Sequence, residues 1–367
     1  MDKINLRDML RNVSPILIKP ASTSITVSLS KRFFLFNLIN KAIKTIEEDP
    51  HLNFISLLKS YKVLGRILYG TVHELHRDRN KMYFKNFFVE RELWKLVRDE
   101  LEWLVKEYKN VSEIKLTLTK RGVMIFDNYK KDSFNVLLMT IHSGTWAPKD
   151  VIEKMKLTPK KRYHYEDIET HKIYSRLVLE KGGIWIDNKL SRFACDFNRN
   201  MEKCIYGNDT EWWISEVWKE PLSESQVTIL KQTYREFYFT LSRLLESYRF
   251  NIIFDGHSMW DSEDRPRLSF GTQHIPKFYM PIVKSMHRKL VNMGYSPAFN
   301  KPYKGGYILK WLSTKFPDLF IFSMEINKVI YTTNNHRKPL KRKIKQLSKD
   351  LSQIFNIEIE DVEYRKS

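Results

Sequence analysis

An apolar stretch that ends at a histidine constrains the fold more than any other feature. Residues 136–141 are almost all apolar and rich in branched side chains, which is typical of a strand covered on both faces. Ser143, Gly144 and Pro148 then break the pattern, so the strand should end near His142. Ligands of open α/β sheets bind just past the carboxyl ends of strands. His142 is therefore the first candidate for chemistry, although a hydrogen-bonded turn histidine fits the same stretch.

A second stretch has the same form. Residues 250–259 begin as an apolar strand and end in a polar turn that contains Asp255, His257 and Ser258. Two buried strands that each deliver a histidine can bring two imidazoles to one metal ion. Zinc accepts imidazole nitrogen, and catalytic zinc sites use three protein ligands and keep one position open. The two stretches therefore predict a zinc site, with a carboxylate as the third ligand.

Composition limits the class of protein. The 367 residues suggest one large domain with a smaller one, or two domains, and 42% hydrophobic residues suffice for a packed core. Two cysteines, Cys195 and Cys204, exclude a disulfide scaffold and argue against a cysteine zinc cluster. The first residues show no signal pattern, and no apolar run reaches the roughly 18 residues of a membrane helix. We therefore expect a cytoplasmic protein without a transmembrane segment.

The formal net charge of +20 suggests an anionic partner. The densest basic run covers residues 337–345, and the rest of the excess is spread along the chain. Such charge attracts nucleic acid, anionic surfaces or acidic substrates. The lysine-rich proteome of a heat-adapted organism would explain the same charge equally well.

The period of the apolar residues changes near Val111. Before it, residues 31–109 show helical spacing, with clear three- and four-residue periods over residues 52–69 and 90–108. One apolar stripe, interpreted as core packing, comprises Phe87, Phe88, Leu93, Leu96, Val97, Leu101, Leu104 and Val105. We therefore expect a basic, mainly helical N-terminal domain or extension over residues 1–110 and a second domain over residues 111–367.

Strand-like and helix-like segments alternate in the second domain, which indicates an α/β sheet. A hairpin is expected from two strands, 113–118 and 123–126, joined by a turn at 120–122. Further strands are expected at 183–186, 193–197, 252–254 and 319–326. Long helices are expected at 223–248 and 339–355. The inward residues of the first helix should be Ile229, Tyr234, Phe237, Leu241, Leu244 and Leu245.

Six short motifs stand at strand ends or turns, in a fixed order. They cover residues 141–144, 191–199, 255–258, 268–272, 300–308 and 324–326. Together they resemble the N-formylglutamate amidohydrolase family over residues 134–332. The resemblance implies a mixed, mostly parallel sheet flanked by helices, similar to zinc carboxypeptidases and other phosphorylase/hydrolase-like proteins, and so makes the second domain a metallohydrolase domain. The sequence departs from the family's pattern in two places. Ile141 stands where the family usually has a proline before the first histidine, and the acidic segment at 165–169 matches only approximately.

The resemblance completes the metal site. It implies one Zn²⁺ per chain, or another divalent metal, held by His142, His257 and Asp167. Glu166 is the alternative to Asp167, because a slip of one residue in the match would exchange them. The same acidic residues would also suit the first turn of a solvated helix.

The resemblance also assigns the residues that contact substrate. Asn198 and Arg199 resemble the pair that grips a substrate carboxylate in zinc carboxypeptidases, with Asp196 orienting them from the same strand face. Glu325, at the end of an apolar strand, would be the general base. Asp255 would accept a hydrogen bond from a ligand imidazole, or cap its turn. The remaining candidates for substrate binding are Arg192, Tyr303, Gly305 and Gly306.

The predicted function is that of a zinc-dependent amidohydrolase. It would hydrolyse an amide bond next to a free carboxylate, in a small amide or peptide substrate, with water activated by the metal. Two alternatives fit the sequence. One is a carboxypeptidase-like peptidase on acidic or cell-wall peptides. The other is a non-catalytic basic protein that binds nucleic acid or a partner on a hydrolase scaffold.

Overall fold

The structure, a computed structural model, describes seven parts of the chain, residues 24–28, 81–84, 87–108, 114–119, 121–207, 216–333 and 338–355. The chain divides into two compact units, Met1–Asp127 and Asn128–Ser367. All of the helical pattern expected before residue 81 lies outside the described residues, as does Arg337 of the basic run. The mainly helical character of residues 1–110 and the division at residue 110 therefore stay predictions.

The described part of the first unit contains five strands and one helix. β1 (Ser24–Ser28), β4 (Lys115–Thr119) and β5 (Val123–Asn128) pair antiparallel in this order, and β2 (Lys81–Phe84) pairs antiparallel with β3 (Phe87–Glu90). The hairpin predicted from the change of period is thus confirmed. α5 (Arg91–Glu107) buries one stripe of its surface, made by Leu93, Val97, Leu101 and Leu104.

The expected stripe was wrong at its beginning. Phe87 and Phe88 lie in β3, and the helix starts only at Arg91. The reason is local: Phe-Phe-Val is a sequence of aromatic and β-branched residues that favours a strand, and β2 supplies the antiparallel partner.

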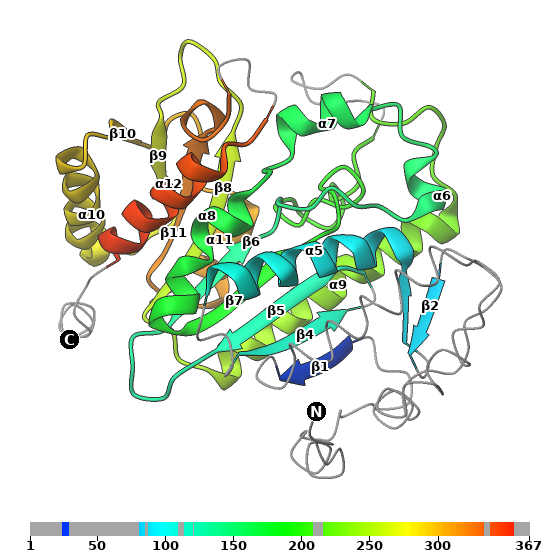
Figure 1. The fold of residues 1–367 in the computed structure, drawn as a ribbon, viewed down its shortest axis with the longest axis horizontal. Coiled ribbons are helices and arrows are strands. Elements are labelled where there is room, and N and C mark those ends of the chain that lie inside the picture. Colours follow the sequence, from blue (N-terminus) through cyan, green and yellow to red (C-terminus); the bar gives the residue numbers. More distant parts are fainter. Residues whose placement is uncertain are drawn as a thin grey trace, which may run out of the picture. The chain divides into compact units, whose positions relative to one another are not determined.

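A mixed, mostly parallel sheet forms the centre of the second unit (Figure 1). Its strands follow the order β7 (Gly183–Asn188), β6 (Val136–Thr140), β8 (Ile252–Met259), β11 (Ile321–Asn327), β9 (Leu268–Gly271) and β10 (Pro297–Phe299). Every pair is parallel except β9 with β11. β6, β7, β8 and β11 are buried along their whole length, which explains their continuous apolar runs.

Helices flank this sheet on both faces, so the predicted fold class is confirmed. α8 (Thr170–Tyr174) and α12 (Lys341–Ile354) lie in front of the sheet in Figure 1, and α9 (Glu224–Ser247) and α11 (Tyr307–Lys315) lie behind it. The other helical segments are α6 (Lys149–Ile152), α7 (Pro159–Tyr165), η3 (Leu177–Lys181), η4 (Lys277–Tyr279), α10 (Met280–Asn292) and η5 (Lys328–Ile330). Among the described residues, no helix is long and apolar enough to cross a membrane.

Two expectations about elements were wrong. Residues 193–197 form turns rather than a strand, because the carbonyl of Ser191 accepts from the amides of Ala194 and Cys195. In α9 the buried face is shifted at its start. Ile229 is 44% exposed, whereas Leu230, one residue later, is 1% exposed. The helix begins at a capping box formed by Ser223 and Gln226, and this cap fixes which residues turn inward.

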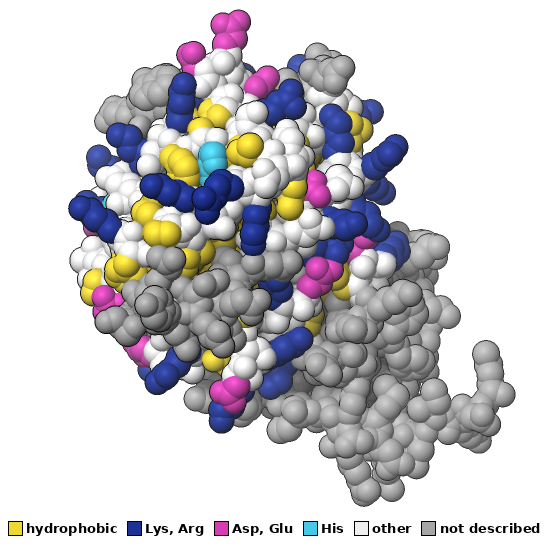
Figure 2. Space-filling view, turned by 90° about the vertical axis from the view of Figure 1, so that its left-hand side faces the viewer, with side chains coloured by type: hydrophobic (Ala, Val, Ile, Leu, Met, Phe, Trp, Pro, Cys, Tyr) yellow, Lys and Arg dark blue, Asp and Glu magenta, His cyan; other side chains and the backbone are white. Residues whose placement is uncertain are grey.

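The face of the second unit that includes α10 and α12 is rich in basic side chains. Figure 2 shows lysine and arginine spread over this face, together with several acidic and many apolar side chains. The start of α12 contributes exposed Lys341, Arg342, Lys343 and Lys345. The start of α12 therefore contributes to the basic surface expected from the net charge.

Candidate metal centre and substrate cavity

The two predicted histidines meet at the carboxyl edge of the sheet. β6 ends at Thr140, and His142 follows one residue later, after Ile141. His257 lies in β8, which pairs parallel with β6. Because parallel neighbours end at the same edge, the two imidazoles come together, with ring centroids 4.9 Å apart. Both side chains are buried.

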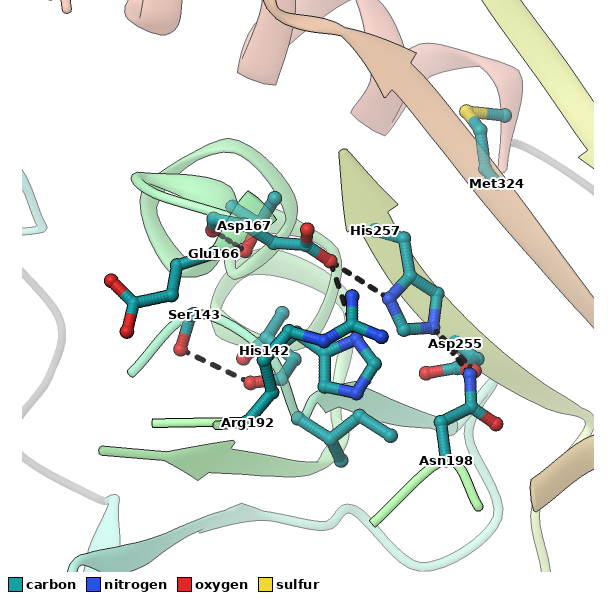
Figure 3. Close-up of polar contacts among 12 residues, drawn as sticks. His142, Ser143, Glu166, Asp167, Arg192, Asn198, Asp255, His257 and Met324 are labelled. Atoms are coloured by element: carbon teal, nitrogen blue, oxygen red, sulfur yellow. Dashed lines mark hydrogen bonds and ion pairs between the residues drawn. The ribbon is translucent and has the colours of Figure 1, made fainter. Parts of the chain in front are cut away.

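Asp167 joins the two histidines. Its Oδ2 atom lies 2.9 Å from Nδ1 of His257 and 3.7 Å from Nδ1 of His142. The three side chains point toward one another in Figure 3, and one ligand atom from each lies within 4.8 Å of the others. The backbone amide of Asp167 donates to the carbonyl of His142, at 2.9 Å, which fixes the loop against the strand end. Two imidazoles and one carboxylate in this arrangement are a donor set for a divalent metal.

Each imidazole has a carboxylate on its other nitrogen. Nε2 of His142 lies 2.7 Å from Oδ1 of Asp196, and Nε2 of His257 lies 2.7 Å from Oδ2 of Asp255. An imidazole that donates Nε2–H to a carboxylate keeps the lone pair of Nδ1 for a metal. Within the described part of the chain, Nδ1 of His142 is buried and has no hydrogen-bond partner. The residues therefore fit a metal ion, and Asp255 has the accepting position that the sequence suggested.

The alternative ligand, Glu166, points away from the histidines (Figure 3). Its Oε1 atom accepts hydrogen bonds from Arg162 at 3.0 Å and from Ser191 at 2.5 Å. Burial raises the pKa of Glu166, while Arg162 and Ser191 lower it. Glu166 thus has its own buried partners, and the structure places Asp167 beside the two histidines.

A buried lysine fixes the segment that precedes Asp167. Nζ of Lys328, directly after β11, donates to the carbonyls of Tyr163, His164 and Glu166 at 2.7–2.8 Å. Lys328 is only 2% exposed, and burial lowers its pKa to about 8. One end of β11 therefore holds the loop that delivers Asp167.

The candidate centre opens into a cavity of about 630 Å³. It is lined by the metal group together with the candidates for catalysis and substrate binding, namely Arg192, Asn198, Arg199, Tyr303, Gly305, Gly306 and Glu325. Lys304 and Arg265 add two further cations to the wall. A cavity with this lining suits a ligand that carries negative charge.

Asn198 is held between His257 and α11. Its Oδ1 accepts from the amide of Ile308 at 3.0 Å, and its Nδ2 lies 3.4 Å from Nε2 of His257. A Cβ atom at Gly306 would come within 2.2 Å of the Asn198 side chain, so a glycine is needed at this close approach. Asp196 orients Asn198 through a turn, by accepting from its backbone amide at 2.8 Å, and not from a shared strand face.

Arg199 and Arg192 occupy neighbouring positions on the wall. The guanidinium of Arg199 lies 4.5 Å from the ring centroid of Tyr206. Arg192 donates to Oδ2 of Asp196 at 2.9 Å, and Tyr206 donates to the same oxygen at 2.7 Å. Arg192 is therefore tied to the carboxylate that holds His142, while Arg199 presents its charge on an aromatic support.

Glu325 lies in β11 and lines the same cavity. Burial raises its pKa to about 8; His257 and Arg192 lower it, and Asp167 and Asp255 raise it further. A carboxyl group that titrates near neutral pH can both accept and return a proton.

Four residues of the site were not predicted from sequence. Lys328 and Arg265 stand in segments without a motif. The acceptors of Lys328 and the Tyr303 partner of Arg265 are distant in the chain. Tyr206 lies in an irregular stretch just beyond the recognised motif that ends at Arg199. Trp260 did have a signal, because it directly follows the buried strand that contains His257 and so belongs to the same sheet edge.

Fold and site together define an α/β protein with a His-Asp-His group at the carboxyl edge of its sheet. The model of the N-formylglutamate amidohydrolase family matches residues 134–332, more than half of the chain. The chain therefore belongs to the N-formylglutamate amidohydrolase family, a family of amide-bond hydrolases. The family predicted from the six motifs, and the span over which they occur, are confirmed.

Comparison with solved structures found several that are similar to this chain. The N-formylglutamate amidohydrolase from Ralstonia eutropha JMP134 is 18% identical, with a TM-score of 0.55, over 67% of this chain and 98% of that chain. A gene product of Agrobacterium tumefaciens is 15% identical, with a TM-score of 0.47, over 64% and 93%. A metallo-carboxypeptidase from Pseudomonas aeruginosa is 9% identical, with a TM-score of 0.30, over 65% and 61%. A search of curated proteins found no match.

Proposed function

We propose that this protein is a zinc-dependent amidohydrolase that cleaves an amide bond next to a free carboxylate. The observation that carries the proposal is the buried group of His142, Asp167 and His257, which shares one cavity with Glu325 and Arg199. Membership of a family of amide-bond hydrolases supports the reaction type. The cations of the cavity wall support a substrate with negative charge.

Nδ1 of His142, Oδ2 of Asp167 and Nδ1 of His257 would hold the zinc ion. When bound, zinc lowers the pKa of water and polarises a carbonyl group. Asp196 and Asp255 would each accept the Nε2–H of one imidazole and so keep Nδ1 of both rings for the metal. Asp167 takes the position between the two rings because its loop is anchored to His142 and Lys328.

Arg199 would bind the free carboxylate of the substrate. Its planar guanidinium can make two parallel hydrogen bonds to a carboxylate, and Tyr206 supports the face of the group. Holding this end of the substrate fixes the position of the neighbouring amide in the cavity.

Glu325 would act as the general base. Its carboxylate would accept a proton from the attacking water and pass it to the leaving nitrogen, so that one residue serves both steps. In the metal-free protein its pKa is about 8, and a bound dication would lower that pKa because it favours the charged form. The base would then be ionised at neutral pH.

The test compares two matched substrates before and after chelation. We expect the purified protein to hydrolyse an N-acyl amino acid, to lose this activity with a chelator, and to regain it with zinc. The same compound with its carboxylate converted to an amide should react at least tenfold more slowly, because the charge-assisted hydrogen bonds to Arg199 are lost. Activity that survives complete removal of metal would contradict the proposal. Equal rates for the two substrates would show that the enzyme does not require a free carboxylate next to the amide.

A further inference from the structure

Arg265 stands between two aromatic rings on the wall of the cavity. Its guanidinium carbon lies 4.5 Å from the ring centroid of Trp260 and 5.4 Å from that of Tyr303. Trp260 and Arg265 belong to the segment between β8 and β9, whereas Tyr303 belongs to the segment between β10 and α11. Two separate segments thus converge on one cation, and all three side chains line the cavity.

The aromatic contacts leave hydrogen-bonding capacity on Arg265. Trp260 and Tyr303 lie close to the guanidinium carbon, and a guanidinium has five N–H donors that point outward in its plane. Within the described part of the chain, Nη1 of Arg265 is buried and has no hydrogen-bond partner. A buried cationic donor without a partner is costly unless a ligand completes it. Arg265 is therefore held ready for a planar anion such as a carboxylate.

Arg265 and Arg199 lie on different parts of the cavity wall. Each stacks on its own aromatic partner, Trp260 and Tyr206 respectively. Between these two partners runs a series of ring contacts, Tyr206 with Phe193 at 5.6 Å, Phe193 with Tyr165 at 6.2 Å, and Tyr165 with Trp260 at 6.4 Å. The wall thus offers two separate positions for anions.

The cavity has room for a ligand that reaches both positions. Its volume of about 630 Å³ falls within the roughly 300–1,000 Å³ of sites that take drug-sized ligands. Tyr303 is 44% exposed, so its ring offers apolar surface to the part of a ligand that lies beside Arg265. A small acyl group would leave this part of the wall without a contact.

We propose that Arg265 is a specificity-determining residue that binds a carboxylate carried by the acyl group of the substrate. The inference rests on the proposed function, because it assigns the carboxylate next to the scissile amide to Arg199. The preferred substrate then has a carboxylate on each side of the amide. Trp260 and Tyr303 hold the guanidinium in place and pack against the acyl chain.

Two substrates that differ only at the acyl end test this proposal. One is an amino acid with an N-glutaryl group, and the other has the same group with its terminal carboxylate converted to a primary amide. We expect kcat/KM of the wild type to be roughly 10- to 100-fold higher for the acid, as for other hydrogen bonds to charged groups. Arg265→Met should lower this ratio to below about threefold. Arg265→Lys should keep part of it, because the charge remains but the planar fork is lost.

Arg288→Met is the matched control, since Arg288 lies on the exposed side of α10 and does not line the cavity. It should keep the wild-type ratio, and thermal melting should show that each variant is folded. A wild type that treats both compounds alike, or an Arg265→Met variant with an unchanged ratio, overturns the proposal. If the zinc-loaded wild type hydrolyses neither compound, the proposed function fails. The affinities of the wild type and Arg265→Met for the two compounds, measured by calorimetry, then test whether Arg265 binds the acyl carboxylate. Loss of the preference for the acid in Arg265→Met would support its role, and an unchanged or absent preference would contradict it.

Discussion

At the scale of single residues, the partners of each side chain determine what it can do. Asp167 and Glu166 are adjacent in the sequence and equally acidic. Glu166 accepts from Arg162 and Ser191, whereas Asp167 faces two imidazoles. The sequence left both open as ligands, because a pattern does not show which of two adjacent side chains faces a strand end.

Glu325→Gln should separate catalysis from metal binding. The substitution keeps the shape of the side chain but removes the base, so kcat should fall by roughly a hundredfold or more. Zinc should stay bound, because Glu325 is not among the three ligand candidates. Steady-state kinetics with zinc measured for each sample checks this. Near-wild-type turnover would remove Glu325 from catalysis, and loss of zinc would make it a ligand.

The same residue should make the stability of the metal-free protein depend on pH. The folded state raises the pKa of Glu325 from 4.5 to about 8, so the folded chain binds this proton more tightly than the unfolded chain. The contribution of this proton to the free energy of unfolding is therefore fully present below pH 4.5. It is lost as the pH rises from 4.5 to 8. Glu325→Gln should be the more stable variant at pH 8.5, by on the order of 5 kcal/mol, and equal to the wild type near pH 4.5. Urea unfolding in the presence of a chelator measures both, and a difference that does not change with pH would contradict the pKa.

At the scale of elements, the sequence predicted what depends on local pattern. The strand before His142, the strand that contains Glu325 and the long helix α9 were expected from their patterns. The expected turn at Asp255, His257 and Ser258 was wrong, because β8 continues through these residues to Met259 and pairs there with β11. The strand predicted at 193–197 was wrong because the apolar residues of this stretch are buried in turns, where a period of two has no meaning. Lys328 was missed because its acceptors are carbonyls more than 160 residues earlier in the chain.

Lys328→Met should therefore weaken the metal site as well as the fold. The substitution leaves three buried carbonyls without their donor, and we expect a loss of about 2–4 kcal/mol in the free energy of unfolding. Zinc affinity should fall at least tenfold, because the loop that delivers Asp167 loses its anchor. Lys284→Met, on the exposed side of α10, should change neither quantity. A Lys328→Met variant that is destabilised but binds zinc like the wild type would show that Lys328 supports only the fold.

At the scale of the whole molecule, the site gathers segments that are far apart in the sequence. His142, Asp167 and His257 come together because β6 and β8 are parallel neighbours and the loop before α8 crosses their common edge. The rule that ligands bind at strand ends predicted this edge. It gives a signal for Trp260, which directly follows β8, but not for Arg265, because the role of Arg265 depends on ring contacts with Trp260 and Tyr303. The basic surface in Figure 2 would favour the approach of an anionic substrate, which agrees with the cations of the cavity.

The central claim is that His142, Asp167 and His257 bind one metal ion, and elemental analysis of the purified protein tests it most directly. We expect about one zinc per chain in the wild type, lost on chelation, and almost none in His142→Ala or His257→Ala. His287→Ala serves as the control, because His287 lies on α10 and its Nε2 bonds the carbonyl of Pro297 instead. This variant should keep its zinc. A wild type without divalent metal, or full occupancy in His142→Ala and His257→Ala, would contradict the account.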